Sequence, residues 1–385
     1  MNVILFDIDR ENFFPLSLNR PISDFRVGIC KIKEKWEFYY DNVSVSSVDY
    51  LLEKFPKNEE NNNLWINSSV LPNKELLVEI NSLRKGEVLI DNDYIIALNN
   101  HDLDHNNLNT IQSHSTYNKI NNLWDIFMLN GDEIKIDFNR ITISRNSHEL
   151  TKGNKKIGDY PLFIEKGAKI ESSFLNCTEG PIYIGKESEI MEGCFVRGPF
   201  AMCEKSVLKM MTRVYRDTTL GPYSKIGGEI SNSVIFGYSS KSHEGYLGNS
   251  IIGEWCNLGA GTNVSNLKNN YDKVKIWNYK SQKFKNSSLQ FCGLIMGDFS
   301  KTGINTMLNT GTVVGVSANI FGSGFPRNFI PSFSWGGSSG FINYRLNKVF
   351  EVNEIVMKRR NIDFSEVDKK ILEKVFSLTS RYRNY

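Results

Sequence analysis

The sequence predicts two regions, a small α/β domain followed by a left-handed parallel β-helix of six-residue repeats. Three observations support this fold class. Short apolar runs alternate with a segment of helical spacing over roughly the first 100 residues. Apolar residues then recur at every sixth position from Ile184 to Ile226. Glycines follow several of these positions, as the tight corners of a coil require.

The first region, which we place at residues 1–110, begins with a buried-strand pattern from Asn2 to Phe6. Residues 28–40 have helical spacing, and residues 64–66 and 88–90 are further strand candidates. This alternation is typical of a small α/β domain. We read residues 111–150 as a linker with a short helix at 121–129, capped by Asn122.

The β-helix is expected over residues 151–330. Eight consecutive apolar residues are spaced by six from Ile184 to Ile226, whereas an α-helix has a period of 3.6 and a strand a period of 2. Each six-residue unit is a short strand plus a turn, and about three units complete a triangular coil around a stacked aliphatic column. The spacing resumes in new phases at Ile252 and Met296. We expect loops to leave the coil at both breaks, the second being the polar stretch 271–290.

Residues 331–385 form the last region. The chain around 322–340 is rich in Gly, Pro, Ser and aromatic residues, which predicts irregular structure. Ser365 to Arg381 follows with the pattern of an amphipathic helix. We expect this helix to cap the open end of the β-helix, which would otherwise expose strand edges.

The composition is that of an ordinary globular protein. The 385 residues are 40% hydrophobic and 23% charged, and the net charge of +3 does not indicate a nucleic-acid-binding protein. No run reaches the roughly 18 apolar residues of a membrane span, and no signal-peptide pattern is present, so we expect a cytoplasmic protein without a membrane partner. No Cys or His group has metal-ligand spacing, so no metal site is predicted from these residues. The cysteines are expected to be buried, reduced thiols: Cys30, Cys177, Cys194, Cys203, Cys256 and Cys292.

The chemistry is expected at the first break in spacing. His243 is the one histidine of the expected β-helix, and a neutral imidazole can take a proton from an amine or a hydroxyl. An ordinary surface histidine is the alternative reading. A Gly-Ala-Gly corner follows at 259–261, where a ligand can approach backbone N–H groups. Arg213 and Lys225 supply positive charge for a phosphate, and Glu229 can hold a hydroxyl or an amine.

The segment from Ile226 to Asn270 resembles the acetyltransferase domain of the GlmU-like family. That family joins glucosamine-1-phosphate acetyltransferase to N-acetylglucosamine-1-phosphate uridylyltransferase. It carries His-x-x-Tyr-Leu-Gly, then Ile-Gly-x-x-x-Asn-(Ile/Leu)-Gly-Ala-Gly-Thr. This chain has the first motif at 243–248 and the second at 252–262, with the family's spacing and no gap.

The resemblance implies a role for each matching residue. His243 corresponds to the general base that deprotonates the sugar amine. The remaining matches are Tyr246, Asn257 and Asn266 as sugar-phosphate contacts, Arg213 as the phosphate-binding arginine, Glu229 at the sugar site, and Ala260, whose backbone N–H contacts acetyl-CoA.

Two departures from the family pattern lie in the same segment. The sugar-site lysine of the family is replaced by Ser231. The later Asn-Tyr pair matches either Asn266-Leu267 without a gap or Asn270-Tyr271 with a four-residue insertion.

The first region resembles the start of a divergent bacterial branch of the same family. An Arg-Pro-x-x-Asp-x-Arg-x-Gly motif spans residues 20–28 and leads into Glu-Lys-Trp at 34–36. The glycine-rich loop that cradles phosphates in the usual sugar nucleotidyltransferase is missing. The metal-binding aspartate of that class corresponds to Ser68 or Ser69 here.

Arginines near this motif are candidates to replace the missing loop. The predicted nucleotide-binding residues are Arg10, Arg20, Asp24 and Arg26. An equally weighted alternative is that Arg20 and Asp24 form a structural ion pair that anchors the turn.

The resemblance implies an acetyl-CoA-dependent N-acetyltransferase acting on an amino-sugar phosphate like glucosamine-1-phosphate. It also implies a homotrimer, with active sites between adjacent prisms. An active first domain would add UDP-N-acetylglucosamine pyrophosphorylase-like nucleotidyl transfer, with a nucleoside triphosphate and Mg²⁺. The alternatives are a sugar-1-phosphate nucleotidyltransferase whose β-helix serves only assembly, and a non-catalytic regulatory subunit.

Overall fold

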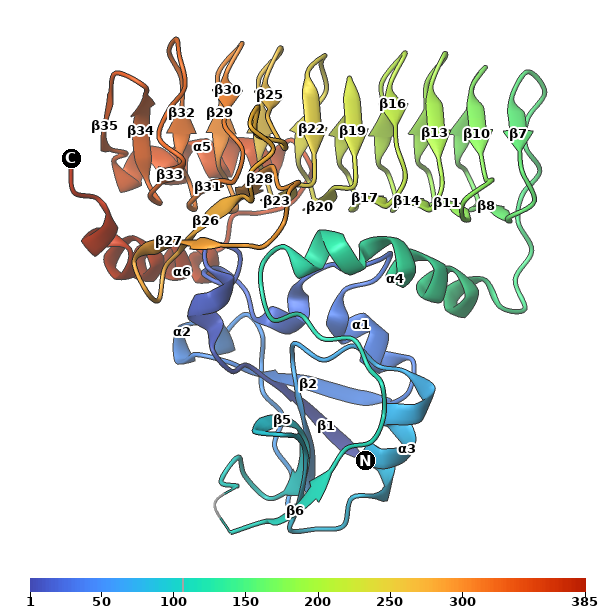
Figure 1. The fold of residues 1–385 in the computed structure, drawn as a ribbon, viewed down its shortest axis with the longest axis vertical. Coiled ribbons are helices and arrows are strands. Elements are labelled where there is room, and N and C mark those ends of the chain that lie inside the picture. Colours follow the sequence, from blue (N-terminus) through green and yellow to red (C-terminus); the bar gives the residue numbers. More distant parts are fainter. Residues whose placement is uncertain (106) are drawn as a thin grey trace.

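A three-sided β-helix lies across one side of a smaller α/β domain (Figure 1). The structure is a computed structural model that describes residues 1–105 and 107–385; residue 106 of the expected first domain lies outside the described residues. The predicted fold class, an α/β domain followed by a left-handed parallel β-helix, is confirmed.

The N-terminal sheet has the strand order β2-β1-β3-β5-β4-β6. Strands β1, β2 and β3 run parallel, whereas β5 is antiparallel to both β3 and β4. The predicted strands at 2–6, 64–66 and 88–90 are confirmed as parts of β1, β3 and β4. The strands are β1 (Asn2–Phe6), β2 (Asn42–Ser46), β3 (Asn63–Asn67), β4 (Glu87–Asp91), β5 (Tyr94–Asn100) and β6 (Asn109–Gln112).

The helices of this domain are α1 (Ile32–Glu37), α2 (Asp49–Leu52), α3 (Lys74–Ser82) and α4 (Asp125–Thr142), with 3₁₀ turns at Arg10–Phe13 and Ile22–Asp24. The predicted helix over 28–40 is therefore shorter than expected, because Gly28 has a φ of 81°, outside the helical region.

The predicted helix at 121–129 is wrong in its bounds and in its cap. Helix α4 begins at Asp125 and continues to Thr142. The Asp125 carboxylate accepts hydrogen bonds from the backbone N–H groups of Asn121 and Asn122, at 2.7 and 2.8 Å. Asn122 is thus held by the first turn of the helix and does not cap it.

A buried ion cluster fixes α1 to α4. The fully buried Lys35 Nζ lies 2.8 Å from Glu133 Oε2 and 2.6 Å from Asp137 Oδ2. The neighbouring Trp36 is also fully buried, and its Nε1 donates to the Val70 carbonyl at 3.1 Å. The Glu-Lys-Trp motif at 34–36 therefore has a structural role in this chain.

Each coil of the β-helix gives one strand to each of three faces, all parallel within a face except for the last strand. The β7–β22 face consists of β7 (Lys155–Ile157), β10 (Phe174–Asn176), β13 (Phe195–Arg197), β16 (Arg213–Val214), β19 (Glu229–Ser231) and β22 (Tyr246–Gly248), and continues in the pair β25 (Asn263–Val264) and β30 (Met307–Leu308).

The second face, β8–β33, packs against the N-terminal domain. Its strands are β8 (Leu162–Ile164), β11 (Ile182–Ile184), β14 (Phe200–Met202), β17 (Thr218–Leu220), β20 (Val234–Gly237), β23 (Ile251–Glu254), β28 (Leu294–Met296), β31 (Thr312–Val314) and β33 (Phe329–Ile330).

The third face, β9–β35, ends in an antiparallel hairpin. Its strands are β9 (Lys169–Ile170), β12 (Glu189–Ile190), β15 (Val207–Leu208), β18 (Lys225–Ile226), β21 (Ser240–Lys241), β24 (Asn257–Leu258), β29 (Lys301–Thr302), β32 (Asn319–Ile320), β34 (Ser334–Gly337) and β35 (Gly340–Asn343).

The inward aliphatic column is confirmed. All eight residues spaced by six from Ile184 to Ile226 are at most 3% exposed and belong to one apolar cluster. At the first break, however, no loop leaves the coil. The column continues through Ile230, Ile235, Lys241 and Leu247 to Ile252, because three turns are shortened: the steps to Ile230, Ile235 and Ile252 are four, five and five residues.

The second break is an inserted hairpin, β26 (Lys275–Asn278) and β27 (Lys283–Asn286). It is not a purely exposed loop as predicted. Val274, Ile276 and Tyr279 are buried, and they join the apolar core that the N-terminal domain shares with the β8–β33 face. That core also contains Phe25 and Phe236, so the two regions have one continuous interior.

The C-terminal helices are α5 (Leu346–Lys358) and α6 (Glu366–Leu378), followed by a 3₁₀ turn at Ser380–Tyr382. The expected cap over the open end is wrong for α6. This helix packs against α2 and α5, and its buried Leu372 and Val375 share a cluster with Leu51 and Val316. Its apolar face therefore covers the junction between the two regions and not the last coil.

The structure can be compared with two expectations that were drawn from the composition. All six cysteines are free and buried, as predicted. Within residues 1–105 and 107–385, every helix is too short or too polar to cross a lipid bilayer.

Candidate active site

Three predicted site residues form a ladder on the β7–β22 face. Arg213, Glu229 and Tyr246 occupy matching positions on β16, β19 and β22, in successive coils. Their neighbours point into the column, so these three side chains point outward. The Arg213 Nε lies 3.6 Å from a Glu229 carboxylate oxygen, and its Nη2 lies 3.0 Å from Glu244 Oε2. The hydrogen bond with Glu244 raises the pKa of Arg213.

Asn266 extends this ladder. Its Nδ2 donates to the Tyr246 hydroxyl at 2.9 Å and to Asn249 Oδ1 at 2.7 Å. Burial raises the pKa of Tyr246. The other candidate for this match, Asn270, is exposed and donates to Asp272 at 2.7 Å. Asn266 is therefore the one of the two that lies beside the predicted sugar-phosphate contacts.

His243 lies at the corner that joins β21 to β22, and its side chain is exposed. The next corner of the β-helix is the Gly-Ala-Gly segment, since Gly261 N–H donates to the Glu244 carbonyl at 3.0 Å. The two corners touch closely at Gly245, where a Cβ would come within 2.1 Å of the Thr262 carbonyl oxygen and φ is 128°. Only glycine fits there.

A buried lysine holds the His243 corner from inside. Lys241 occupies an inward position of the aliphatic column and is 2% exposed. Its Nζ donates to the carbonyls of Gly227, His243 and Gly245, at 3.0, 3.1 and 2.7 Å. Burial lowers the pKa of Lys241 to about 8. The sequence pattern missed this residue because the column was taken to stop at Ile226.

Ala260 lies on the Gly-Ala-Gly corner, half-buried. Its carbonyl accepts from Asn305 N–H at 2.7 Å, whereas no acceptor for its own N–H is found in the described part of the chain. The equivalent corner positions of other coils carry long exposed side chains, Met210 and Ile304. Ala260 carries only a methyl group at this position.

Asn257 lies on the opposite side of the corner from the ladder, on the β9–β35 face. It lines a hollow of about 480 Å³ between this face and the end of α5, together with Tyr238 and Trp255, whose rings stack at 4.3 Å. We call it the basic hollow. Five cations line it: Lys209, Lys225, Lys301, Arg359 and Arg360.

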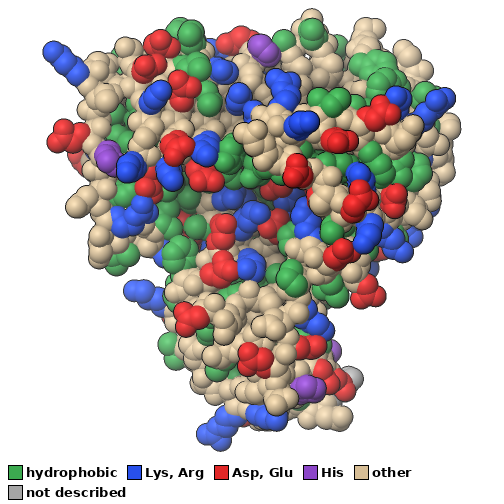
Figure 2. All heavy atoms as spheres, turned by 180° about the vertical axis from the view of Figure 1, so that it is seen from behind, with side chains coloured by type: hydrophobic (Ala, Val, Ile, Leu, Met, Phe, Trp, Pro, Cys, Tyr) green, Lys and Arg blue, Asp and Glu red, His purple; other side chains and the backbone are tan. Residues whose placement is uncertain are grey.

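The charges of the basic hollow are not compensated. No carboxylate lines it, and none of the five cations forms an ion pair with any described residue. Burial lowers the pKa of Lys225, with Arg360 and Lys209 adding to the effect, and burial and Arg359 lower the pKa of Arg360. Elsewhere acidic and basic side chains alternate over the surface, as on the face seen in Figure 2. A cluster of one sign inside a hollow attracts an anion.

The predicted nucleotide-binding arginines point their donors at the chain itself. Arg20 is 4% exposed, and its guanidinium lies 2.8 Å from Asp24, 3.1 Å from Glu254 and 2.5 Å from Asp298. The alternative prediction, an Arg20–Asp24 ion pair, is thus present as part of a larger network. Glu254 and Asp298 both belong to the β-helix, so this network joins the two regions.

Arg26 and Arg10 are engaged in the same way. The buried Arg26 donates to the carbonyls of Phe236, at 3.3 Å, and of Ile29. Arg10 lies 3.2 Å from Asp7 and donates to the Ser17 carbonyl. A phosphate at any of these guanidinium groups would have to displace acceptors of the chain.

The carboxyl edge of the parallel strands, where such sheets usually bind ligands, is covered. Residues 9–24 lie over it, with Phe13, Leu16 and Ile22 buried. Asp7 accepts from Ile22 N–H at 3.1 Å and from Ser47 at 2.6 Å, and burial raises its pKa. In the described residues no three His, Cys, Asp or Glu side chains converge as a metal site.

Comparison with known proteins gives matches in both regions. Residues 3–146 match the sequence model of the family described as sugar nucleotidyl transferase. The bifunctional protein GlmU of Methanococcus aeolicus is 27% identical over 316 residues, which cover 80% of this chain and 64% of that protein. GlmU of Methanococcus maripaludis is 30% identical over 288 residues, covering 74% and 61%. This chain spans less than two thirds of the length of these curated relatives.

Matches over smaller parts of the chain are also found. A bifunctional sugar-1-phosphate nucleotidylyltransferase/acetyltransferase of Sulfurisphaera tokodaii is 30% identical over 145 residues, covering 37% of this chain and 36% of that protein. Among solved structures, the polySia-specific acetyltransferase NeuO has 13% identity and a TM-score of 0.27, covering 50% of this chain and 87% of its own.

Proposed function

We propose, from the premise that this chain is a divergent member of the GlmU-like family, that its β-helix transfers an acetyl group from acetyl-CoA to the amine of an amino-sugar phosphate such as glucosamine-1-phosphate. One observation supports this above all. An exposed imidazole lies at a corner with a polar ladder on one side and the basic hollow on the other.

The two sides of the corner suit two different substrates. The basic hollow, with five unpaired cations and two stacked rings, suits the phosphates and the adenine of coenzyme A. The ladder suits a sugar phosphate. A phosphate would replace the exposed Glu244 at Arg213, while Glu229 and the Tyr246–Asn266 pair bind hydroxyl groups.

The proposed reaction is direct transfer. The amine nitrogen attacks the thioester carbonyl carbon, the new C–N bond forms, and the His243 imidazole takes up the proton that the nitrogen loses. The Ala260 N–H stabilises the negative charge that develops on the carbonyl oxygen. The C–S bond then breaks, and the leaving sulfur takes a proton to give the free thiol of coenzyme A.

We further propose a homotrimer in which a neighbouring copy completes each site. The β7–β22 face carries the stacked rings of Phe174 and Phe195, 5.1 Å apart and 40% and 49% exposed. Exposed stacked aromatic rings in line with the ladder suit coverage by a second copy. We place the protein in the cytoplasm, where its six free thiols would remain reduced.

Sugar-1-phosphate nucleotidyl transfer is a second candidate, because the family match covers residues 3–146. Two features argue against this activity: the carboxyl edge of the parallel strands is covered, and Arg20 and Arg26 are bound to groups of the chain itself. Its test is Mg²⁺-dependent release of pyrophosphate from a nucleoside triphosphate and a sugar-1-phosphate.

The test of acetyl transfer is thiol release from acetyl-CoA in the presence of glucosamine-1-phosphate. We expect His243→Ala to lower kcat by about 10²- to 10⁴-fold, the usual contribution of a general base. His148→Ala is the control, because His148 is also exposed but lies before the first coil. Equal rates for wild type and His243→Ala would show that His243 is not the general base. Absence of thiol release in the wild type with several amino-sugar phosphates would favour a non-catalytic subunit.

A further inference from the structure

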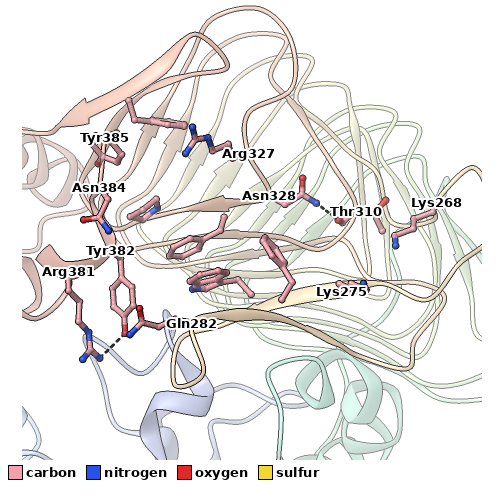
Figure 3. Close-up of a pocket in the computed structure, with 15 residues that line it drawn as sticks. Lys268, Lys275, Gln282, Thr310, Arg327, Asn328, Arg381, Tyr382, Asn384 and Tyr385 are labelled. Atoms are coloured by element: carbon pink, nitrogen blue, oxygen red, sulfur yellow. Dashed lines mark hydrogen bonds between the residues drawn. The ribbon is translucent and has the colours of Figure 1, made fainter.

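A second hollow, of about 680 Å³, lies toward the C-terminal end of the β-helix (Figure 3). Its lining comes from the β26–β27 hairpin, residues 327–331, β35 and residues 381–385, together with Lys268 and Thr310. Its volume is typical of small-molecule sites. No residue of the ladder, of the His243 corner or of the basic hollow lines it. We call it the aromatic hollow.

Aromatic rings make up much of its wall. Trp277 stacks on Phe329 with ring centroids 4.2 Å apart, and Phe284 meets Trp277 edge-on at 5.3 Å. Phe341 and Tyr385 add a second ring pair at 6.1 Å. Phe284 and Tyr385 are 44% and 45% exposed, so part of each side chain can contact a flat ligand ring.

The polar groups of the aromatic hollow are cations and amides. In Figure 3, Lys268, Lys275, Arg327 and Arg381 surround it together with the amides of Gln282, Asn328 and Asn384. No Asp or Glu side chain lines it. Arg381 approaches Glu11 at 3.6 Å, but neither Lys275 nor Arg327 has an ion-pair partner among the described residues. The hollow therefore offers positive charge and amide hydrogen bonds beside open rings.

This combination selects a ligand with both a flat ring and phosphate groups. A neutral sugar would leave the cations uncompensated, and an inorganic anion would leave the rings uncovered. We propose that the aromatic hollow is a nucleotide-binding site, separate from the acetyl-transfer site, for a nucleoside diphosphate or a nucleotide-linked sugar. The base stacks on the rings, the amides bind its edge, and Lys275 and Arg327 bind the phosphates.

Isothermal titration of the full chain with ADP and with UDP tests this site, with uridine and inorganic pyrophosphate as half-ligands. We expect at least one of the two nucleotides to bind at least 10-fold more tightly than either half-ligand. Because the readout is binding, it is independent of whether the chain transfers acetyl groups.

Variants locate the bound nucleotide. We expect Lys275→Ser/Arg327→Ser, and separately Phe284→Ser, to weaken binding at least 10-fold; all three side chains are exposed, so folding should be unaffected. Lys283→Ser is the matched control, since it is exposed on the same hairpin but does not line the hollow.

Three outcomes would overturn the proposal. The first is no binding of either nucleotide. The second is binding of pyrophosphate as tight as that of the nucleotides, which would indicate a general anion site. The third is binding that coenzyme A displaces and that Arg359→Ser/Arg360→Ser abolishes, which would place the nucleotide in the basic hollow.

Discussion

Two groups of cations in this molecule differ in whether they have carboxylate partners. At the junction of the two regions, Arg20 lies within 3.1 Å of three carboxylates and is 4% exposed. In the basic hollow, Lys225, Lys301, Arg360 and their neighbours have no ion-pair partner among the described residues. The first group is used to hold the domains together, whereas the second is free for a ligand. The partners of a cation, and not its place in a motif, indicate its role.

The largest expected effect tests the first group. Arg20→Met would leave Asp24, Glu254 and Asp298 close together without their common cation. Removing one partner of a buried ion network costs about 3–5 kcal/mol of unfolding free energy. Urea denaturation followed by circular dichroism measures it.

Arg213→Met is the matched control, because Arg213 is 42% exposed and its ion pairs should contribute less than about 1 kcal/mol. Equal losses for the two variants would contradict a structural role for Arg20. Unchanged stability together with weaker nucleotide binding would instead support the nucleotide-binding role expected from the sequence.

Lys241 sharpens the comparison as a third kind of cation, which is buried and bound only by carbonyl groups. Its pKa is lowered by burial from 10.5 to about 8. Between these two values the unfolded chain holds a proton that the folded chain releases. The free energy of unfolding should therefore rise by up to about 3 kcal/mol as the pH increases from about 8 to about 10.5. Below about pH 8 this contribution is absent.

Urea denaturation midpoints at intervals from pH 7 to pH 10 measure this pH-dependent part of the stability. We expect Lys241→Met to show a smaller rise than the wild type, whereas Lys283→Met, at an exposed position, should follow the wild type. If Lys241→Met rises as steeply as the wild type, the ammonium of Lys241 is not the group that titrates.

The smallest expected effect tests the second group. Arg359→Ser/Arg360→Ser removes two unpaired cations from the basic hollow and should raise the KM for acetyl-CoA about 10-fold, equal to about 1.4 kcal/mol, with kcat unchanged. The difference from the wild type should shrink at high salt. Initial rates of thiol release at varied acetyl-CoA concentration measure both constants.

Lys348→Ser is the control for this pair, because Lys348 lies on α5 but pairs with Glu351 at 2.7 Å outside the hollow. A fall in kcat at constant KM would mean that the two arginines act on the reaction and not on binding of the acyl donor.

Local spacing was sufficient to predict the β-helix. Every sixth residue from Ile184 to Ile226 points inward because strand, turn and coil geometry repeat with the chain itself. The site residues Arg213, Glu229 and Tyr246 were predicted from the resemblance to the GlmU-like family, and the structure places them at matching outward positions on successive coils. The spacing failed between Ile226 and Ile252, where three turns are shortened, and it therefore missed Lys241.

By itself, then, the sequence determined the two-region fold and the aliphatic column. Only the tertiary structure decided what each charge faces. Glu254 and Asp298 reach Arg20 from more than 230 positions away, and Arg359 and Arg360 join Lys225 across the end of α5. Periodicity is set between near neighbours in the chain, whereas the partner of a charge is set by which distant segments pack together.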